Sequence, residues 1–488
     1  MGSRQSNGRF DVPRTRHASH DGFVVQKPTP EPDNGSPAAA PPNSPKRSRK
    51  SRSLTAIGAI TVGVLLIAFA GIGWKIWDGN RAIERNQALL EPFYTPPADI
   101  PAKPGTIIRS EPMDDVEVPG GKGYRLLYTS TGFTGEPAAV SGMIFIPTAP
   151  APAEGRKVVA WAHPTTGLAD KCAPSRSSHE LHDLDVWLDQ AMSYGWVVTA
   201  TDYLGLGTPG PNTYLIGTQE AADVVNSVRA ARNFPDSNAG SDWIVWGHSQ
   251  GGHSALWTGT LADKIAPELK LRGVGAAAPA SELTSIVSEQ WRTPVGWAIG
   301  PDALVSFQDY YGTTKFSDSL SGLGKSDLAD LLGECVLDAG VEGLLASKLD
   351  GTFFGTNPIQ NPAWAQAAVA QTPAPLPASM PVFLSQGTAD TIVLSGSNAL
   401  MQETWCKAGS DMTVQWLGDI DHQHVAMASG SSFIEWANNV FDAKPPKRNC
   451  DVPPASPPIA AVVPPENLLV PSVINAPSLG SDAGKPAV

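Results

Sequence analysis

The stretch at positions 242–252, DWIVWGHSQGG, places a serine between two glycines in the pattern Gly-x-Ser-x-Gly. The apolar run Trp243–Trp246 before it is typical of a buried strand, and residues 253–261 after it are compatible with a helix. A catalytic serine at a sharp strand-to-helix turn needs glycine two positions to either side, because the turn packs closely against its neighbours. The stretch therefore predicts that Ser249 is a nucleophile. The alternative is a glycine-rich turn whose serine only caps a helix.

Strand and helix signals alternate on both sides of this turn. The strand-like runs are almost continuously apolar, as a sheet covered on both faces requires. Between them lie helix patterns such as Glu220–Asn233. We therefore expect an α/β fold, with a mostly parallel central sheet and helices on both faces. Gly123–Tyr128 and Ala138–Ile146 predict an antiparallel start to the sheet. The parallel strands are expected at Lys157–Ala162, Trp196–Thr201, Trp243–Trp246, Gly273–Ala278, Pro381–Ser385 and Thr413–Leu417.

Residues 281–377 interrupt this alternation between two predicted strands. The segment is rich in Gly, Ala and aromatic residues, and it is too long for a plain connection. We expect a helical cap, inserted before the strand that leads to the acid residue. A separately packed subdomain without substrate contact stays an alternative.

The ends of the chain differ in charge from its middle. Residues 1–53 hold ten Lys or Arg and four Asp or Glu, which leaves −18 for the remainder of a chain of net charge −12. The acidic remainder argues against nucleic-acid binding, which needs a basic surface. Residues 1–53 are polar and poor in aromatics, and we expect a disordered basic tail in the cytoplasm.

Residues 54–77 predict a transmembrane signal-anchor helix. The 21 residues Leu54–Trp74 carry no charge, and about 20 apolar residues span a bilayer. Five Lys or Arg residues at 46–52 outnumber the three at 75–85, which favours an extracytoplasmic catalytic part held at the membrane. The alternative is a signal peptide cleaved near Ala70, which would give a secreted protein.

The remaining boundaries follow composition. We expect a linker or stalk at 78–104, a globular domain at 105–445 and a Pro/Ala-rich tail at 446–488. The four cysteines, at positions 172, 335, 406 and 450, all follow the predicted membrane segment, and their spacing fits no zinc pattern. Two disulfides in an oxidising compartment are expected, and three pairings are possible.

A serine nucleophile needs a base, and the base needs a carboxylate that orients it. In strand-to-helix serine sites the acid and then the histidine follow the serine along the chain. Asp390 lies a few residues beyond the strand-like run Pro381–Ser385. We predict Asp390 as the orienting acid; a turn aspartate that caps the next helix is the alternative.

The base is one of two histidines after the last predicted strand. His422 and His424 both lie before an amphipathic helix, and the base is expected just ahead of that helix, which favours His424 over His422. The same stretch also offers Asp419 and Asp421 as metal ligands, but clustering alone is weak support for a metal site. We therefore expect no metal and no organic cofactor.

Two backbone N–H groups are expected to stabilise the oxyanion. One belongs to Gln250, directly after the nucleophile, and the other to the loop after the early strand Lys157–Ala162. Thr165 is the preferred second donor, with Thr166 next, because Pro164 has no N–H. His163 and His253 are interpreted as structural.

These motifs resemble the secretory lipases of the α/β-hydrolase superfamily, the yeast lipase A type and its bacterial relatives. The resemblance covers about 110–440 and is carried by HPTTG at 163–167, DYLGLG at 202–207, VRAAR at 228–232, GHSQGG at 247–252 and the loops of Asp390 and His424. It implies an α/β-hydrolase fold, a Ser249–Asp390–His424 triad, a cap over an acyl pocket and the disulfides Cys172–Cys335 and Cys406–Cys450. The chain departs from many relatives in having His163-Pro164 where they have His-Gly.

The sequence thus predicts a serine hydrolase, a lipase or carboxylesterase that cleaves fatty-acyl esters through an acyl-enzyme. A peptidase or an acyltransferase with the same triad is the alternative. A non-catalytic surface-binding protein on a hydrolase scaffold is a further one. A small-molecule or lipid ester and the membrane are the expected partners.

Overall fold

The computed structural model describes residues 83–114, 116–177, 182–444 and 446–469. The basic tail expected at 1–53 and the membrane anchor expected at 54–77, with the alternative cleavage near Ala70, lie outside the described residues. Within the described part of the chain, no helix combines the length and apolarity that crossing a bilayer requires.

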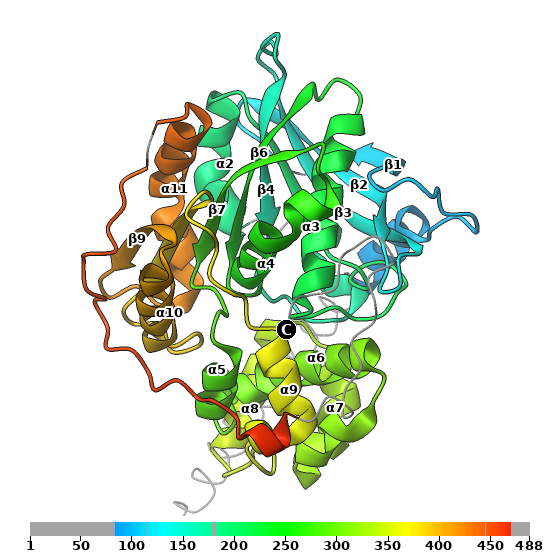
Figure 1. The fold of residues 1–488 in the computed structure, drawn as a ribbon. Helices are drawn as coiled ribbons and strands as arrows, with labels where there is room; N and C mark the ends of the chain where they lie inside the picture. Colours follow the sequence, from blue (N-terminus) through cyan, green and yellow to red (C-terminus); the bar gives the residue numbers. More distant parts are fainter. Residues whose placement is uncertain (1–82, 115, 178–181, 445, 470–488) are drawn as a thin grey trace, which may run out of the picture. The chain divides into compact units, whose positions relative to one another are not determined.

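A nine-stranded sheet forms the centre of the catalytic unit, in the order β1-β2-β3-β5-β4-β6-β7-β8-β9 (Figure 1). The first three strands and the β3–β5 pair are antiparallel, and every pair from β5 to β9 is parallel. The expected α/β fold with an antiparallel start is confirmed. The strands are β1 Ile107–Pro112, β2 Gly121–Thr131, β3 Pro137–Pro147, β4 Arg156–Ala162, β5 Val197–Thr201, β6 Ala239–His248, β7 Lys270–Ala277, β8 Pro381–Gly387 and β9 Asp411–Leu417.

Helices cover both faces of the sheet because each central strand is apolar on both sides. In β6, Trp243 and Val245 belong to the core under one set of helices, whereas Ile244 and Trp246 belong to the core under the other. This alternation is the two-residue period of a strand. One face carries α3 (Gly217–Asn233), α4 (Gln250–Ile265) and α10 (Ser395–Ala408); the other carries α2 (His182–Ser193) and α11 (Val425–Phe441).

The segment between β7 and β8 is helical, as the predicted cap requires. It lies below the sheet in Figure 1 and has a hydrophobic core of its own, which includes Trp297, Phe307 and Trp364. Its helices are α5 Leu283–Gln290, α6 Pro294–Tyr311, α7 Gly322–Leu331, α8 Val336–Ser347 and α9 Pro362–Ala370, with short 3-10 turns at Thr314–Ser319 and Pro358–Gln360.

The stretch before β1 is not a plain linker. Residues 83–94 are helical, and the last of them, Tyr94, is fully buried. The Tyr94 hydroxyl lies 2.8 Å from Ser175 Oγ, and the Arg176 guanidinium stacks on the Tyr94 ring and pairs with Glu91 at 3.0 Å. The linker expected at 78–104 is therefore corrected in its described part, because a buried aromatic residue fixes it to the catalytic unit.

Both predicted disulfides are confirmed, Cys172–Cys335 and Cys406–Cys450. The second one holds the start of the C-terminal segment 446–469, which runs without strands along α10 towards the cap (Figure 1). This segment is tied down by backbone contacts: the Ile459 N–H donates to the Gly396 carbonyl, and the Val462 N–H donates to Ser285 Oγ, each at 3.0 Å.

Candidate active site

Ser249 stands at the turn between β6 and α4, in a strained backbone conformation. Its φ is 56° and its ψ is −115°, a backbone conformation that residues other than glycine rarely adopt. The flanking glycines make room for this turn. A Cβ on Gly247 would lie 2.0 Å from the Gly251 carbonyl oxygen, and a Cβ on Gly251 would lie 1.8 Å from the Ala162 carbonyl oxygen. The glycines expected on either side of the nucleophile are therefore sterically required.

Replacing Gly251 with alanine is expected to destabilise the fold by about 3 kcal/mol or more, because the added methyl group overlaps a backbone atom that cannot move alone. Gly322, the first residue of α7, is the matched control, since a Cβ there would meet nothing within 4 Å. The Gly322→Ala protein should stay within about 1 kcal/mol of the wild type. Urea unfolding measures both, and equal midpoints for the two variants would contradict the steric argument.

His422 is the histidine that contacts the serine. Its Nε2 lies 2.9 Å from Ser249 Oγ, and its Nδ1 lies 2.8 Å from Asp390 Oδ2. All three residues are at least nine-tenths buried. The arrangement has the order and the contacts of a nucleophile, a base and an orienting acid.

His424, the base expected from the sequence, lies elsewhere, and the expectation is corrected to His422. The His424 side chain is 57% exposed and its Nδ1 bonds Asp421 on the surface. The physical reason is the 3-10 turn His422–His424, which Asp421 caps. With three residues per turn, side chains two positions apart point in different directions, so only His422 faces Ser249. Among the residues that the structure describes, no three His, Cys, Asp or Glu side chains are grouped so that they could hold a metal ion.

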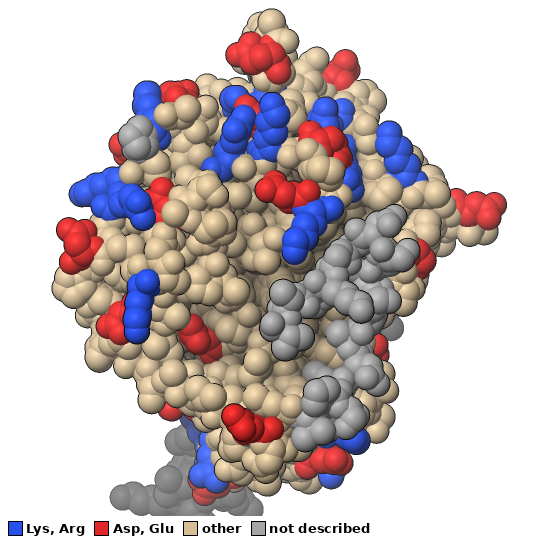
Figure 2. Space-filling view, in the orientation of Figure 1, with Lys and Arg blue, Asp and Glu red and all other residues tan. Residues whose placement is uncertain are grey.

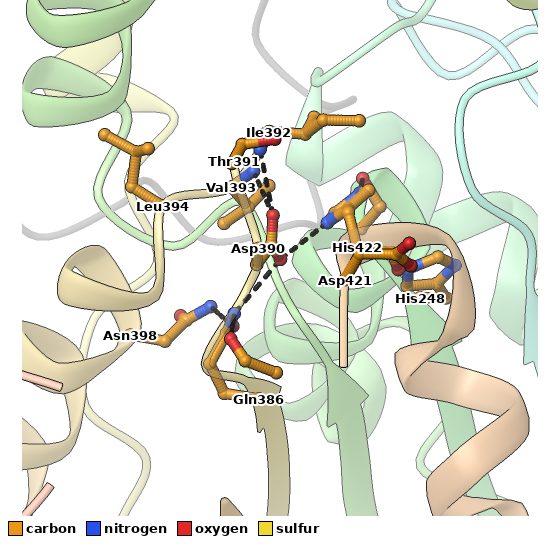
Figure 3. A network of polar contacts seen from close by, with 12 residues as sticks. His248, Gln386, Asp390, Thr391, Ile392, Val393, Leu394, Asn398, Asp421 and His422 are labelled. Atoms are coloured by element: carbon orange, nitrogen blue, oxygen red, sulfur yellow. Dashed lines mark hydrogen bonds and ion pairs between the residues drawn. The ribbon is translucent and has the colours of Figure 1, made fainter. Parts of the chain in front are cut away.

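Asp390 is held by a network that sequence reasoning missed (Figure 3). Its Oδ1 accepts the N–H groups of Ile392 and Val393, at 2.9 and 3.0 Å, and its Oδ2 also accepts from Gln386 Nε2 at 3.0 Å. Gln386 in turn accepts a hydrogen bond from Asn398 Nδ2 at 2.6 Å. These bonds fix the direction of the Asp390 side chain towards His422. Gln386 directly follows the predicted strand Pro381–Ser385, and nothing in the strand pattern marks its role.

The surroundings of His422 favour the neutral form of its ring. Burial lowers the pKa of the His422 ring, and this effect outweighs the opposing hydrogen bond and charge of Asp390. The neutral ring is therefore the favoured form near neutral pH, and its lone pair at Nε2 can accept the hydroxyl proton of Ser249.

An apolar cavity of about 360 Å³ opens above Ser249, between the sheet and the cap. Ser249, His422 and Thr165 line it together with apolar side chains of α5, α6 and α8. The helical segment between β7 and β8 therefore forms part of the cavity wall. The cap residues at the cavity include Leu283, Ile286, Val287, Trp291, Ile299, Leu337, Val341 and Leu344.

The two expected oxyanion donors come from the chain segments that follow β6 and β4. Gln250 is the first residue of α4, and N–H groups in the first turn of a helix have no partner within that helix. Thr165 follows β4 and its hydroxyl donates to the Tyr214 hydroxyl at 2.9 Å, which fixes its side chain at the cavity wall. Thr166 is turned away, and its carbonyl accepts the N–H of Val336 in the cap.

The two histidines interpreted as structural, His253 and His163, make buried contacts. His253 Nδ1 lies 3.2 Å from the buried Glu220 carboxylate, and its Nε2 lies 2.7 Å from the Gln371 carbonyl oxygen. His163 Nδ1 lies 2.6 Å from the Pro164 carbonyl oxygen. Neither ring is among the residues that line the cavity, in agreement with the structural interpretation.

Known proteins resemble this chain in sequence and in fold. A model of the secretory lipase family matches residues 180–449, which is more than half of the chain. The chain belongs to the secretory lipase family. The family membership confirms the resemblance drawn from the motifs, and it makes this secretory lipase an ester-hydrolysing serine hydrolase.

This secretory lipase is similar in sequence or in structure to several known proteins. Lipase 5 of Candida albicans is 26% identical over 392 residues, which cover 74% of this chain and 82% of that protein. The probable inactive lipase MT1628 of Mycobacterium tuberculosis is 27% identical over 243 residues, 44% of this chain and 52% of that protein. The structure of Candida antarctica lipase A in its closed state matches with a TM-score of 0.60 at 20% identity, covering 78% of this chain and 92% of that one. The structural match shows a common fold.

Proposed function

We propose that this protein hydrolyses fatty-acyl esters through an acyl-enzyme formed on Ser249. The observation that carries the proposal is the continuous chain of contacts from Ser249 through His422 to Asp390, at the base of an apolar cavity. Each contact lies within the hydrogen-bond distance that proton transfer needs.

In the proposed cycle, Ser249 Oγ attacks the ester carbonyl carbon while its proton passes to His422 Nε2. The bond from the carbonyl carbon to the alcohol oxygen then breaks, and His422 Nε2 gives the proton to the departing alcohol. Water attacks the acyl-serine with its proton passing to the same nitrogen, and that proton returns to Ser249 as the acid leaves. Asp390 keeps Nδ1 protonated throughout, which leaves Nε2 free to accept.

The negative charge that develops on the carbonyl oxygen would be stabilised by the N–H groups of Gln250 and Thr165. Their placement at the start of α4 and at the cavity wall beside Ser249 supports this assignment. The positive end of the α4 dipole would add to the stabilisation.

The substrate class follows from the walls of the cavity. Its lining is almost wholly aliphatic or aromatic, and its border includes exposed apolar residues of α8, namely Leu337, Val341 and Leu344. On the face drawn in Figure 2, charged side chains gather over the sheet-containing part, whereas the band next to the cap is largely uncharged. An apolar acyl chain gains free energy on entering such a site, at about 0.8 kcal/mol per buried methylene group.

A fluorophosphonate probe and an ester series test the proposal. We expect the probe to label the wild type once per chain, and the Ser249→Ala protein not at all. Ser193→Ala, which removes an exposed serine, is the control and should label like the wild type. With 4-nitrophenyl esters, kcat/KM should rise from acetate to medium-chain acids. Failure to label the folded wild type would contradict catalysis by Ser249.

The same assay separates the rival reactions. Faster cleavage of peptide anilides than of esters would indicate a peptidase, and transfer of the acyl group to an added alcohol in preference to water would indicate an acyltransferase. Both outcomes would overturn ester hydrolysis as the function while keeping the same serine.

We also propose that the catalytic unit works outside the cytoplasm, anchored by residues 54–77. The two disulfides support an oxidising compartment, and the basic residues at 46–52 support an N-terminus in the cytoplasm. Protease treatment of intact cells should remove the catalytic unit from the membrane fraction. A mature N-terminus at Gly71 would overturn the anchor.

A further inference from the structure

A second aspartate–histidine pair lies behind the candidate base. His248, the residue before the nucleophile, is 1% exposed, and its Nδ1 lies 2.7 Å from Asp183 Oδ2 in the first turn of α2. Its Nε2 lies 2.9 Å from the backbone carbonyl oxygen of His422. Figure 3 shows the His248 ring beside the loop that carries His422, and the two ring centroids are 4.9 Å apart.

The partners of His248 determine where its protons are. A backbone carbonyl can only accept, so Nε2 must carry a proton. The Asp183 carboxyl oxygen can likewise accept a hydrogen bond from Nδ1. With both ring nitrogens donating, one to Asp183 and one to the His422 carbonyl, the ring is positively charged. Burial opposes this charge, but the charge and hydrogen bond of Asp183, the charge of Asp390 and the bond to the His422 carbonyl together outweigh burial and raise the pKa of His248.

We propose that the Asp183–His248 pair positions His422 and biases it towards its neutral form, and this role rests on the proposed ester hydrolysis. Four groups act on the His422 ring: Ser249 and Asp390 by direct contact, the His248 ring at close range, and Asp183 from behind His248. Of the charged groups, Asp390 and Asp183 favour an imidazolium at His422, and His248 disfavours it. His248 lies between Asp183 and His422. The positive charge of His248 is therefore nearer to the His422 ring than the negative charge of Asp183 is.

The consequence for catalysis concerns both proton transfers. A base that is less basic remains neutral at lower pH, so the enzyme keeps its activity into mildly acidic conditions. A less basic ring also releases its proton more readily to the departing alcohol. The bond from His248 Nε2 to the His422 carbonyl adds a positional role, because it ties the 3-10 turn His422–His424 to the nucleophile turn.

The His248→Gln protein tests the charge separately from the bond. The Gln side chain can place an N–H where Nε2 stands, but it carries no charge. Without the cation, the pKa of His422 should rise, so the acid limb of the kcat/KM profile should move to higher pH by about 0.5–1 unit. His424→Gln is the matched control, because His424 is two residues from His422 but lies on the surface. The acid limb of the His424→Gln protein should coincide with that of the wild type.

Three results distinguish the possibilities. An upward shift in His248→Gln, made smaller when Asp183→Asn is added, would support the charged pair. An acid limb that stays within about 0.2 unit of the wild type in an active, folded His248→Gln protein would overturn it. Loss of activity with no change in the acid limb would indicate a merely structural residue and would also overturn it.

A measurement on the wild type covers the case in which His248→Gln does not fold. In the protein labelled with ¹⁵N-histidine, a ring with two protonated nitrogens should be seen at pH 7.5 whose signal is lost in Asp183→Asn. Absence of such a histidine from the wild type would overturn the proposal. The measurement does not depend on ester turnover, so it separates failure of this inference from failure of the proposed function.

Discussion

Replacing His422 with alanine is expected to lower kcat for ester hydrolysis by about 10⁵–10⁶-fold, because the Ser249 hydroxyl then has no base to accept its proton. His424→Ala is the matched comparison and should keep kcat within about twofold of the wild type, since the His424 side chain is 57% exposed and pairs only with Asp421. Steady-state hydrolysis of a 4-nitrophenyl ester measures both.

The two variants are well matched, because the two histidines are two residues apart and both precede α11. Circular dichroism of both variants would show that each is folded. A large loss in His424→Ala, with little loss in His422→Ala, would contradict the contact of His422 with Ser249 and would restore the histidine that the sequence favours.

Replacing Ser249 with alanine is expected to lower kcat by about 10⁶-fold, leaving only the rate that the oxyanion donors and binding supply, about 10³–10⁴ over water. KM should change little, because the apolar cavity that binds the acyl chain is untouched. Titration of active sites before the assay is needed, since a wild-type contaminant of one part in 10⁵ would hide the effect.

A Ser249→Ala protein with more than about 1% of wild-type kcat would mean that the measured hydrolysis does not use this serine. In that case the scaffold would resemble a binding protein with adventitious activity, one of the alternatives that the sequence leaves open.

The fold was largely predictable because its signals are local. Trp243, Ile244, Val245 and Trp246 are apolar on both faces of one strand, which requires a covered sheet. The helix 83–94 was missed because its docking depends on Tyr94 and Arg176, which are 82 residues apart and carry no joint signal in the sequence. The first strand, Ile107–Pro112, was missed as well; it is short and only half buried at the sheet edge.

The turn at Ser249 could be predicted from the sequence because its signal is local: such a turn needs glycine two positions to either side, and Gly247 and Gly251 are there. The sequence also pointed to Asp390, whose strand and loop follow a simple chain order. Only the tertiary structure decided which histidine faces the serine, since the contact joins residues 173 positions apart and depends on the direction of one 3-10 turn. The contact of His248 with Asp183 has the same origin, because it exists only where the fold brings α2, the turn at Ser249 and the His422 loop together.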